Sequence, residues 1–80
     1  MEPELLQRVT FDPAIFGGKA VIRGRRLAVE HVLQMMAAGS SAEELMRHYP
    51  WLEADDIRAC LLYAARLAGS ERILPAITAK

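Results

Sequence analysis

The chain has 80 residues, of which 52% are hydrophobic and 25% charged, and its formal net charge is zero at pH 7. This composition is typical of one small globular domain with a modest core, and it excludes a disordered chain. A single cysteine excludes an internal disulfide. The sequence has no run of ~20 apolar residues that could span a membrane and no basic segment followed by an apolar one, as in a signal peptide. We therefore expect no membrane partner and a cytoplasmic location.

The N-terminal third of the chain is expected to form a β hairpin or ribbon. Residues 8–11 alternate β-branched and aromatic side chains, and residues 21–23 form a second short run. Turn-forming residues lie between the two runs, so we predict a ribbon and a basic turn within residues 8–27. Two strands alone are marginal in water, so the ribbon has to pack on helices or on another ribbon, and the second case favours a dimer.

Helical periodicity begins at residue 29. The apolar side chains there follow the i, i+3, i+4, i+7 spacing of one buried stripe: Val29, Val32, Leu33 and Met36. Gly39 suits a left-handed helix end. Ser41 and Glu44 fit a capping box that opens a short second helix over about residues 42–49, and Pro50 ends that helix.

A third helix is predicted after a four-residue break, with Asp55 and Asp56 at the positive end of its dipole and Gly69 at its end. Its expected buried side consists of Ile57, Cys60, Leu61, Ala64, Ala65 and Ala68. The predicted fold is therefore mainly α: a three-helix helix-turn-helix bundle over residues 29–68, preceded by the ribbon and followed by a C-terminal tail over residues 69–80. Together these parts form a single domain over residues 1–80.

No catalytic or metal site is predicted. His31 and His48 lack Cys, Asp or Glu neighbours at metal-ligand spacing, and we interpret both as surface or helix-end residues. Cys60 is interpreted as a buried core thiol. The Gly17–Lys19 step lacks the serine or threonine of a phosphate-binding loop. We therefore expect no enzyme activity, no cofactor and no metal.

A cluster of basic residues is the sharpest functional signal. Eight consecutive positions without an acid contain Lys19, Arg23, Arg25 and Arg26. The guanidinium fork of arginine fits phosphate and carboxylate alike, so this cluster is a candidate contact for nucleic acid or for an acidic pocket of a protein. The third alternative is a solvent-exposed turn whose arginines contact no partner. A protein that coats nucleic acid without sequence preference is usually basic overall, which this chain is not.

The predicted third helix opens with acids. In a helix-turn-helix module the N-terminal residues of the recognition helix meet base edges, and here these residues include Glu53, Asp55 and Asp56. Carboxylates are repelled by DNA phosphates, although one aspartate can accept a hydrogen bond from cytosine. We interpret the acids as helix-capping residues, and we expect any DNA contact to come from the basic ribbon.

Apolar residues near the C-terminus form a candidate protein contact. On a helical wheel Leu62 lies away from the predicted buried stripe and close to Arg66. The tail adds an apolar segment with Ile73, Leu74 and Ile77. These residues are the predicted contact for a protein partner, whereas Trp51 is interpreted as a plug at the end of the core.

Five short motifs follow one another between residues 8 and 66. They are Val-Thr-Phe-Asp-Pro at 9–13, Gly-Lys-Ala-Val-Ile-Arg-Gly-Arg-Arg-Leu at 18–27, Ala-Gly-Ser-Ser-Ala-Glu-Glu at 38–44, Tyr-Pro at 49–50 and Asp-Asp-Ile-Arg at 55–58. In this order they resemble the small bacterial family known as domain of unknown function 433. The resemblance implies a homeodomain-like helix-turn-helix after a β segment, and an antitoxin often encoded beside a PIN-like ribonuclease.

The chain departs from the family pattern at two places. Where the family usually has Gly-Thr-Arg-Ile-Pro-Val, this chain has Arg25 in place of threonine and Ala28 in place of proline, so the turn is more basic and less rigid. Glu53 stands where the third helix usually opens with serine or threonine, which weakens the N-cap.

One leading hypothesis and two alternatives follow. The leading hypothesis is the antitoxin of a type II toxin–antitoxin pair, a homodimer that binds and inhibits a PIN-like ribonuclease toxin and also binds its operator DNA. Its contacts would be the basic residues 19–26 or the apolar C-terminal surface. The alternatives are a stand-alone helix-turn-helix DNA-binding transcriptional regulator and an adaptor protein that binds no nucleic acid.

Overall fold

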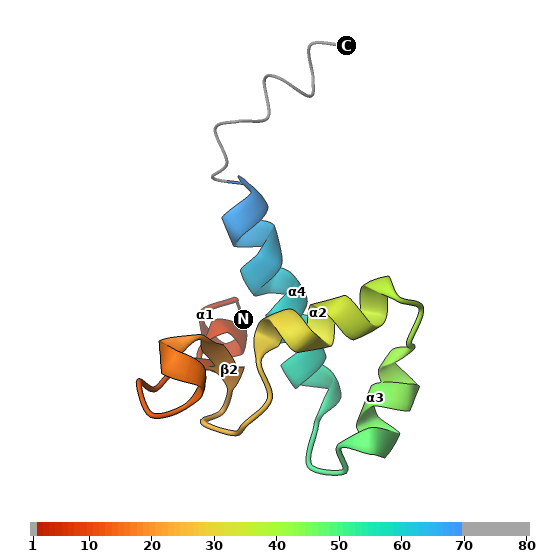
Figure 1. Ribbon diagram of the computed structural model, residues 1–80. Coiled ribbons are helices and arrows are strands. Elements are labelled where there is room, and N and C mark those ends of the chain that lie inside the picture. Colours follow the sequence, from red (N-terminus) through yellow and green to blue (C-terminus); the bar gives the residue numbers. More distant parts are fainter. Residues whose placement is uncertain (1, 70–80) are drawn as a thin grey trace.

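The computed structural model describes residues 2–69, which form a helical body with one β hairpin at its side (Figure 1). In chain order the elements are α1 (Glu2–Leu6), β1 (Val9–Phe11), the short 3-10 turn η1 (Phe16–Gly18), β2 (Ala20–Ile22), α2 (Val29–Ala37), α3 (Ala42–His48) and α4 (Ala54–Gly69). Helix α4 passes through the middle of the molecule and projects from it at its C-terminal end (Figure 1). The predicted mainly α fold with a short N-terminal hairpin is confirmed.

The hairpin is part of the core of its own chain. Strands β1 and β2 pair antiparallel, with Val9 opposite Ile22. Both side chains are buried in one cluster with Leu27 and with residues of the helices, and β1 packs against α4 while β2 packs against α2. The ribbon therefore finds the partner that it needs within the chain, and its packing gives no separate reason for a dimer.

Helix α1 is an element that the sequence did not predict. It lies where residues before the first strand were expected to be extended, and it packs against α4. Leu5 is half-buried against the core cluster. Five residues are too few to show a helical period, and a helix this short is stable only through tertiary packing.

The turn between α2 and α3 follows the predicted capping signals. Gly39 has a φ of 110°, and the N–H groups of Gly39 and Ser40 each donate at 3.0 Å to a carbonyl in the last turn of α2. The backbone N–H of Glu44 donates to the Ser41 hydroxyl, and the Glu44 carboxylate accepts from the Ser41 backbone N–H. Both orphan donors at the start of α3 are thus satisfied, as the capping box requires.

The buried side of α4 was predicted correctly only in its first turns. Ile57 and Cys60 are buried as expected, but Leu61 is 47% exposed, and Ala65 and Ala68 are exposed too. The prediction that these last three residues belong to the core is wrong, because they lie on the side of α4 opposite the one that carries Ala59, Cys60 and Tyr63. The tail contacts predicted at Ile73, Leu74 and Ile77 lie outside the described residues.

Candidate functional site

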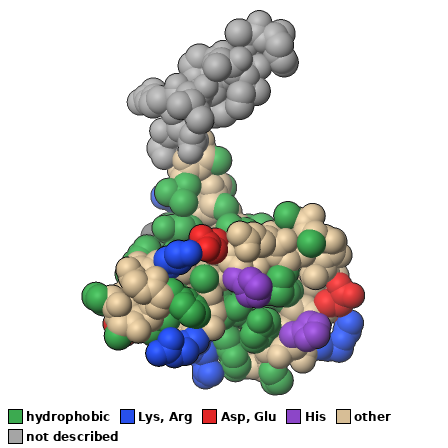
Figure 2. Space-filling view, in the orientation of Figure 1, with side chains coloured by type: hydrophobic (Ala, Val, Ile, Leu, Met, Phe, Trp, Pro, Cys, Tyr) green, Lys and Arg blue, Asp and Glu red, His purple; other side chains and the backbone are tan. Residues whose placement is uncertain are grey.

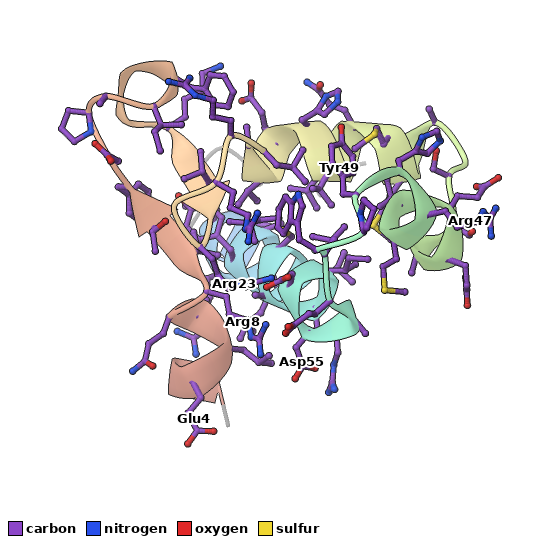
Figure 3. The ribbon with its side chains drawn as sticks, turned by 90° about the horizontal axis from the view of Figure 1, so that it is seen from below. Glu4, Arg8, Arg23, Arg47, Tyr49 and Asp55 are labelled. Atoms are coloured by element: carbon purple, nitrogen blue, oxygen red, sulfur yellow. The ribbon has the colours of Figure 1, made fainter. Side chains whose placement is uncertain are left out.

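The basic turn after β2 folds back toward the start of α4. Arg23 has a φ of 48° and Gly24 a φ of 70°, and the Gly24 N–H donates to the Thr10 hydroxyl at 2.8 Å. A left-handed conformation is uncommon for arginine, so the turn must be held by surrounding contacts. In Figure 3 the labelled residues Arg8 and Arg23 lie next to each other beside the first turn of α4.

Asp56 is the group that both arginines reach. Its side chain is completely buried, and Arg23 binds it bidentately, with Nε 2.9 Å from Oδ1 and Nη2 2.7 Å from Oδ2. Arg8 adds a bond from Nη1 to Oδ1 at 2.9 Å, and the Glu53 backbone N–H donates to Oδ2 at 2.8 Å. We call Arg8, Arg23, Glu53 and Asp56 the Asp56 cluster.

The Asp56 cluster joins three segments that are far apart in the sequence. Arg8 follows α1, Arg23 follows β2 and Asp56 lies in the first turn of α4. Asp56 also caps its own helix, because its carboxylate accepts from the backbone N–H three residues earlier. The interpretation of the acids as capping residues therefore holds for Asp56. Its second role, as the anchor for two arginines, was not predicted.

The hydrogen bonds of the cluster control the ionisation of Asp56. Burial by itself raises the pKa of this carboxyl, but the bonds from Arg23, from the Glu53 backbone and from Arg8 outweigh burial. The pKa of Asp56 therefore lies below its ordinary value of 3.8. At a pH just below 3.8 the carboxylate is therefore still ionised in the folded state, whereas it is mostly protonated in the unfolded chain.

Acid should therefore destabilise the domain through Asp56. Because the folded pKa is depressed, the stabilisation is complete well above pH 3.8 and is lost as the pH falls through that value toward the lower folded pKa. We expect urea unfolding of the wild type to show a falling free energy of unfolding in this range. The decline should be shallower in Asp56→Asn, and parallel curves for the two proteins would contradict this role of Asp56.

The other three basic residues of the predicted cluster have different surroundings. Lys19 Nζ lies 2.7 Å from Glu30 Oε2. The Arg25 guanidinium lies over the Trp51 ring, 4.6 Å from its centroid, which is a cation–π distance. Arg26 forms no ion pair among residues 2–69, and it shares a shallow hollow with Lys19. With Arg23 held by Asp56, the four residues do not act as one patch of unpaired charge.

Trp51 connects the basic turn to the core. Its side chain is half-buried and packs against the core cluster, with the Tyr49 ring 6.2 Å away in an edge-on arrangement. Its backbone carbonyl accepts a hydrogen bond from Arg23 at 3.0 Å. This placement agrees with the interpretation of Trp51 as a plug at the end of the core. It also fixes Arg25 on the protein surface.

The projecting half of α4 carries exposed apolar residues. Leu61, Ala65 and Ala68, which we call the outer stripe, are all exposed and follow i, i+4, i+7 spacing. Leu62, predicted as a partner contact, is half-buried, while Arg66 is exposed. The helical wheel thus placed Leu61 inside and Leu62 outside, and the structure has Leu61 as the more exposed of the two. Figure 2 shows hydrophobic side chains on this projecting part.

A groove of about 330 Å³ lies between β2, α2 and α4, and the sequence did not predict it. We call it the α4 groove; its lining includes Lys19, Ala20, Glu30, Leu33, Tyr63 and Leu67. Its residues on α4, Tyr63 and Leu67, follow the buried residue Cys60 by one and two helical turns, so they lie on the same side of the helix. That continuation is the sequence signal that could have identified them.

The described part of the chain contains no group of three or more His, Cys, Asp and Glu side chains arranged to hold a metal ion. Cys60 is fully buried, as predicted, and burial raises the pKa of its thiol to about 12, so it remains protonated. No helix within residues 2–69 is long and apolar enough to cross a membrane.

Comparisons with known proteins agree with the resemblance drawn from the motif order. The family described as "Protein of unknown function (DUF433)" matches residues 9–64. The uncharacterized protein y4eO of Sinorhizobium fredii is 40% identical over 67 residues, which are 81% of this chain and 30% of that protein. The crystal structure of a DUF433 member from Anabaena variabilis superposes with a TM-score of 0.71 at 31% identity, over 80% of this chain and 64% of that one. The chain thus spans less than two thirds of either relative.

Proposed function

The chain belongs to the DUF433 protein family, and from this premise we propose that it is the antitoxin of a type II toxin–antitoxin pair and inhibits a PIN-like ribonuclease. The observation that supports this function best is the outer stripe of α4. An apolar helix face that is exposed on a projecting helix is a common means of binding another protein. The partner would receive this face in a groove of its own surface.

The chemistry of the outer stripe favours a protein contact. Leu61 supplies the one large apolar side chain, 47% exposed, and the alanines beyond it let a partner approach the helix closely. Arg58 and Arg66 lie beside the stripe, and Arg58 pairs with Asp55 at 3.4 Å. The stripe itself is uncharged, so its apolar side chains are the proposed contact.

The start of α4 is poorly suited to reading DNA. Glu53 and Asp55 are both about half exposed at the end of the helix that a helix-turn-helix protein would insert into the major groove. Three arginines, Arg8, Arg23 and Arg58, pair with the three acids here, so the start of α4 carries no excess positive charge for DNA phosphates. If the chain binds operator DNA as well, Arg25 and Arg26 are its available contacts.

Co-expression with the protein encoded beside it tests the proposal. We expect a stable complex by size exclusion with mass determination, and loss of the partner's ribonuclease activity within it. Leu61→Asp should weaken the complex by about 2 kcal/mol, near thirtyfold in Kd, because a charge would be placed in an apolar contact. Gln34→Asp, which adds the same charge to an exposed position on α2, is the matched control and should bind normally.

Two results would contradict the antitoxin function: the absence of a complex, or a complex in which the ribonuclease stays fully active. The regulator alternative would gain support if the chain alone bound its upstream DNA with a strong salt dependence. Removing Arg25 and Arg26 together should then reduce the slope of log affinity against log salt by about two.

A further inference from the structure

The side of α4 that faces the core continues beyond the body of the domain. Cys60 on this side is fully buried, Tyr63 one turn later is half-buried, and Leu67 one turn further is 54% exposed. Ala20 and Leu33 form the facing wall of the α4 groove from β2 and α2. This side of α4 is therefore apolar both where it is buried in the core and where it is exposed to solvent. Exposed apolar surface of this kind is typical of a site that binds another protein.

Further apolar surface adjoins the groove on the β ribbon. Phe11 is 59% exposed, and its ring centroid lies 6.2 Å from that of Tyr63. Tyr63 lines the groove, so Phe11 extends the apolar surface from α4 onto β1. The hydrophobic surface thus comes from two elements held in a fixed relation by the core.

The charged rim of the groove indicates which partner fits. Lys19 and Glu30 line it, pair at 2.7 Å and are both more than half exposed. A wholly acidic or basic partner would meet a like charge at one of them. A second copy of this chain, turned by a two-fold axis, can place its Glu30 against Lys19 and its Lys19 against Glu30.

We propose that the α4 groove is the contact between two copies of this chain in a two-fold symmetric dimer. Leu67 of each copy packs into the groove of the other, and the Lys19 and Glu30 side chains exchange partners between copies. This inference is independent of the proposed antitoxin function, because it concerns the chain alone and uses the groove side of α4 rather than the outer stripe.

Sedimentation equilibrium of the full chain over a range of concentrations tests the contact. We expect a mass of twice 8.9 kDa at high concentration. Leu67→Asp should raise the dimer Kd at least about tenfold, since it places a carboxylate in the apolar contact. Leu61→Asp, which adds the same charge to the outer stripe, should leave the dimer Kd unchanged. A monomer at all concentrations, or equal effects of the two variants, would overturn the proposal.

Charge reversal separates contacts between copies from contacts within one copy. In Lys19→Glu both rim residues are acidic, and in Glu30→Lys both are basic, so each variant should dimerise poorly alone. When mixed, the two variants should form a heterodimer, because every rim contact between copies then joins opposite charges.

A second pair of variants controls for overall charge. Arg47→Glu and Glu43→Lys reverse exposed charges on α3 and give the same net charges as the rim variants. Native mass spectrometry of each mixture should show at least about tenfold more heterodimer over homodimer for the rim pair than for this control. Equal heterodimer fractions in the two mixtures would overturn the proposed contact.

Discussion

Asp56→Ala is expected to lower the free energy of unfolding by about 3 kcal/mol, the lower end of the range for breaking a buried ion pair by removing one partner. The Arg8 and Arg23 side chains left behind are 27% and 32% exposed, so water relieves part of their lost pairing. The first turn of α4 loses its cap at the same time. A domain of this size has a total stability of only ~4–12 kcal/mol, so the loss should be large in proportion.

Urea unfolding, followed by circular dichroism and by the fluorescence of Trp51, measures this effect. Asp55→Ala is the matched control, because Asp55 is half exposed and its two ion pairs, with Arg58 at 3.4 Å and with Arg8 at 3.9 Å, are longer than those of Asp56. It should cost less than about 1 kcal/mol. Asp56→Asn keeps the size of the side chain and one acceptor, so its cost should fall between the two. Similar losses for Asp56→Ala and Asp55→Ala would show that the cluster does not hold the three segments together.

Ile22→Ala is expected to destabilise the whole domain by about 3 kcal/mol, within the range measured for truncating large aliphatic side chains in cores. Ile22 is fully buried although it lies in a two-stranded hairpin, and it belongs to the cluster that includes residues of α2, α3 and α4. Its loss should leave a cavity in the common core. The hairpin and the helices should therefore unfold in one transition.

The control for Ile22→Ala lies in the opposite strand. Phe11→Ala removes a larger side chain from the same hairpin, but that side chain is 59% exposed, and its loss should cost less than about 1 kcal/mol. Circular dichroism reports the helices and Trp51 reports the end of the core. If Ile22→Ala left the helical transition unchanged, the hairpin would be an appendage and not part of the core.

The two proposals assign different sides of α4 to different partners. The outer stripe, with Leu61, is proposed for the toxin, and the groove side, with Leu67, for a second copy of the chain. The same two substitutions therefore test both proposals, with opposite expected results. Leu61→Asp should weaken the toxin complex and spare the dimer, whereas Leu67→Asp should weaken the dimer.

Local signals in the sequence were sufficient for most of the helical fold. The helix end at Gly39 and the capping box of Ser41 and Glu44 both agree with the structure. Each of them depends only on residues a few positions apart. The strands and the change to a helical period at Val29 were likewise predicted from neighbouring residues. Such contacts form within one turn, so they can be recognised without knowledge of the rest of the chain.

The candidate site was beyond the reach of such signals. Asp56 lies 48 residues from Arg8 and 33 residues from Arg23, so no pattern of neighbours connects them, and the sequence assigned Arg23 to an external partner. The exposure of Leu61 depends on which side of α4 the hairpin and the other helices cover. Pairing of distant charges and coverage of a helix face are set by the packing of whole elements, which only the tertiary structure decides.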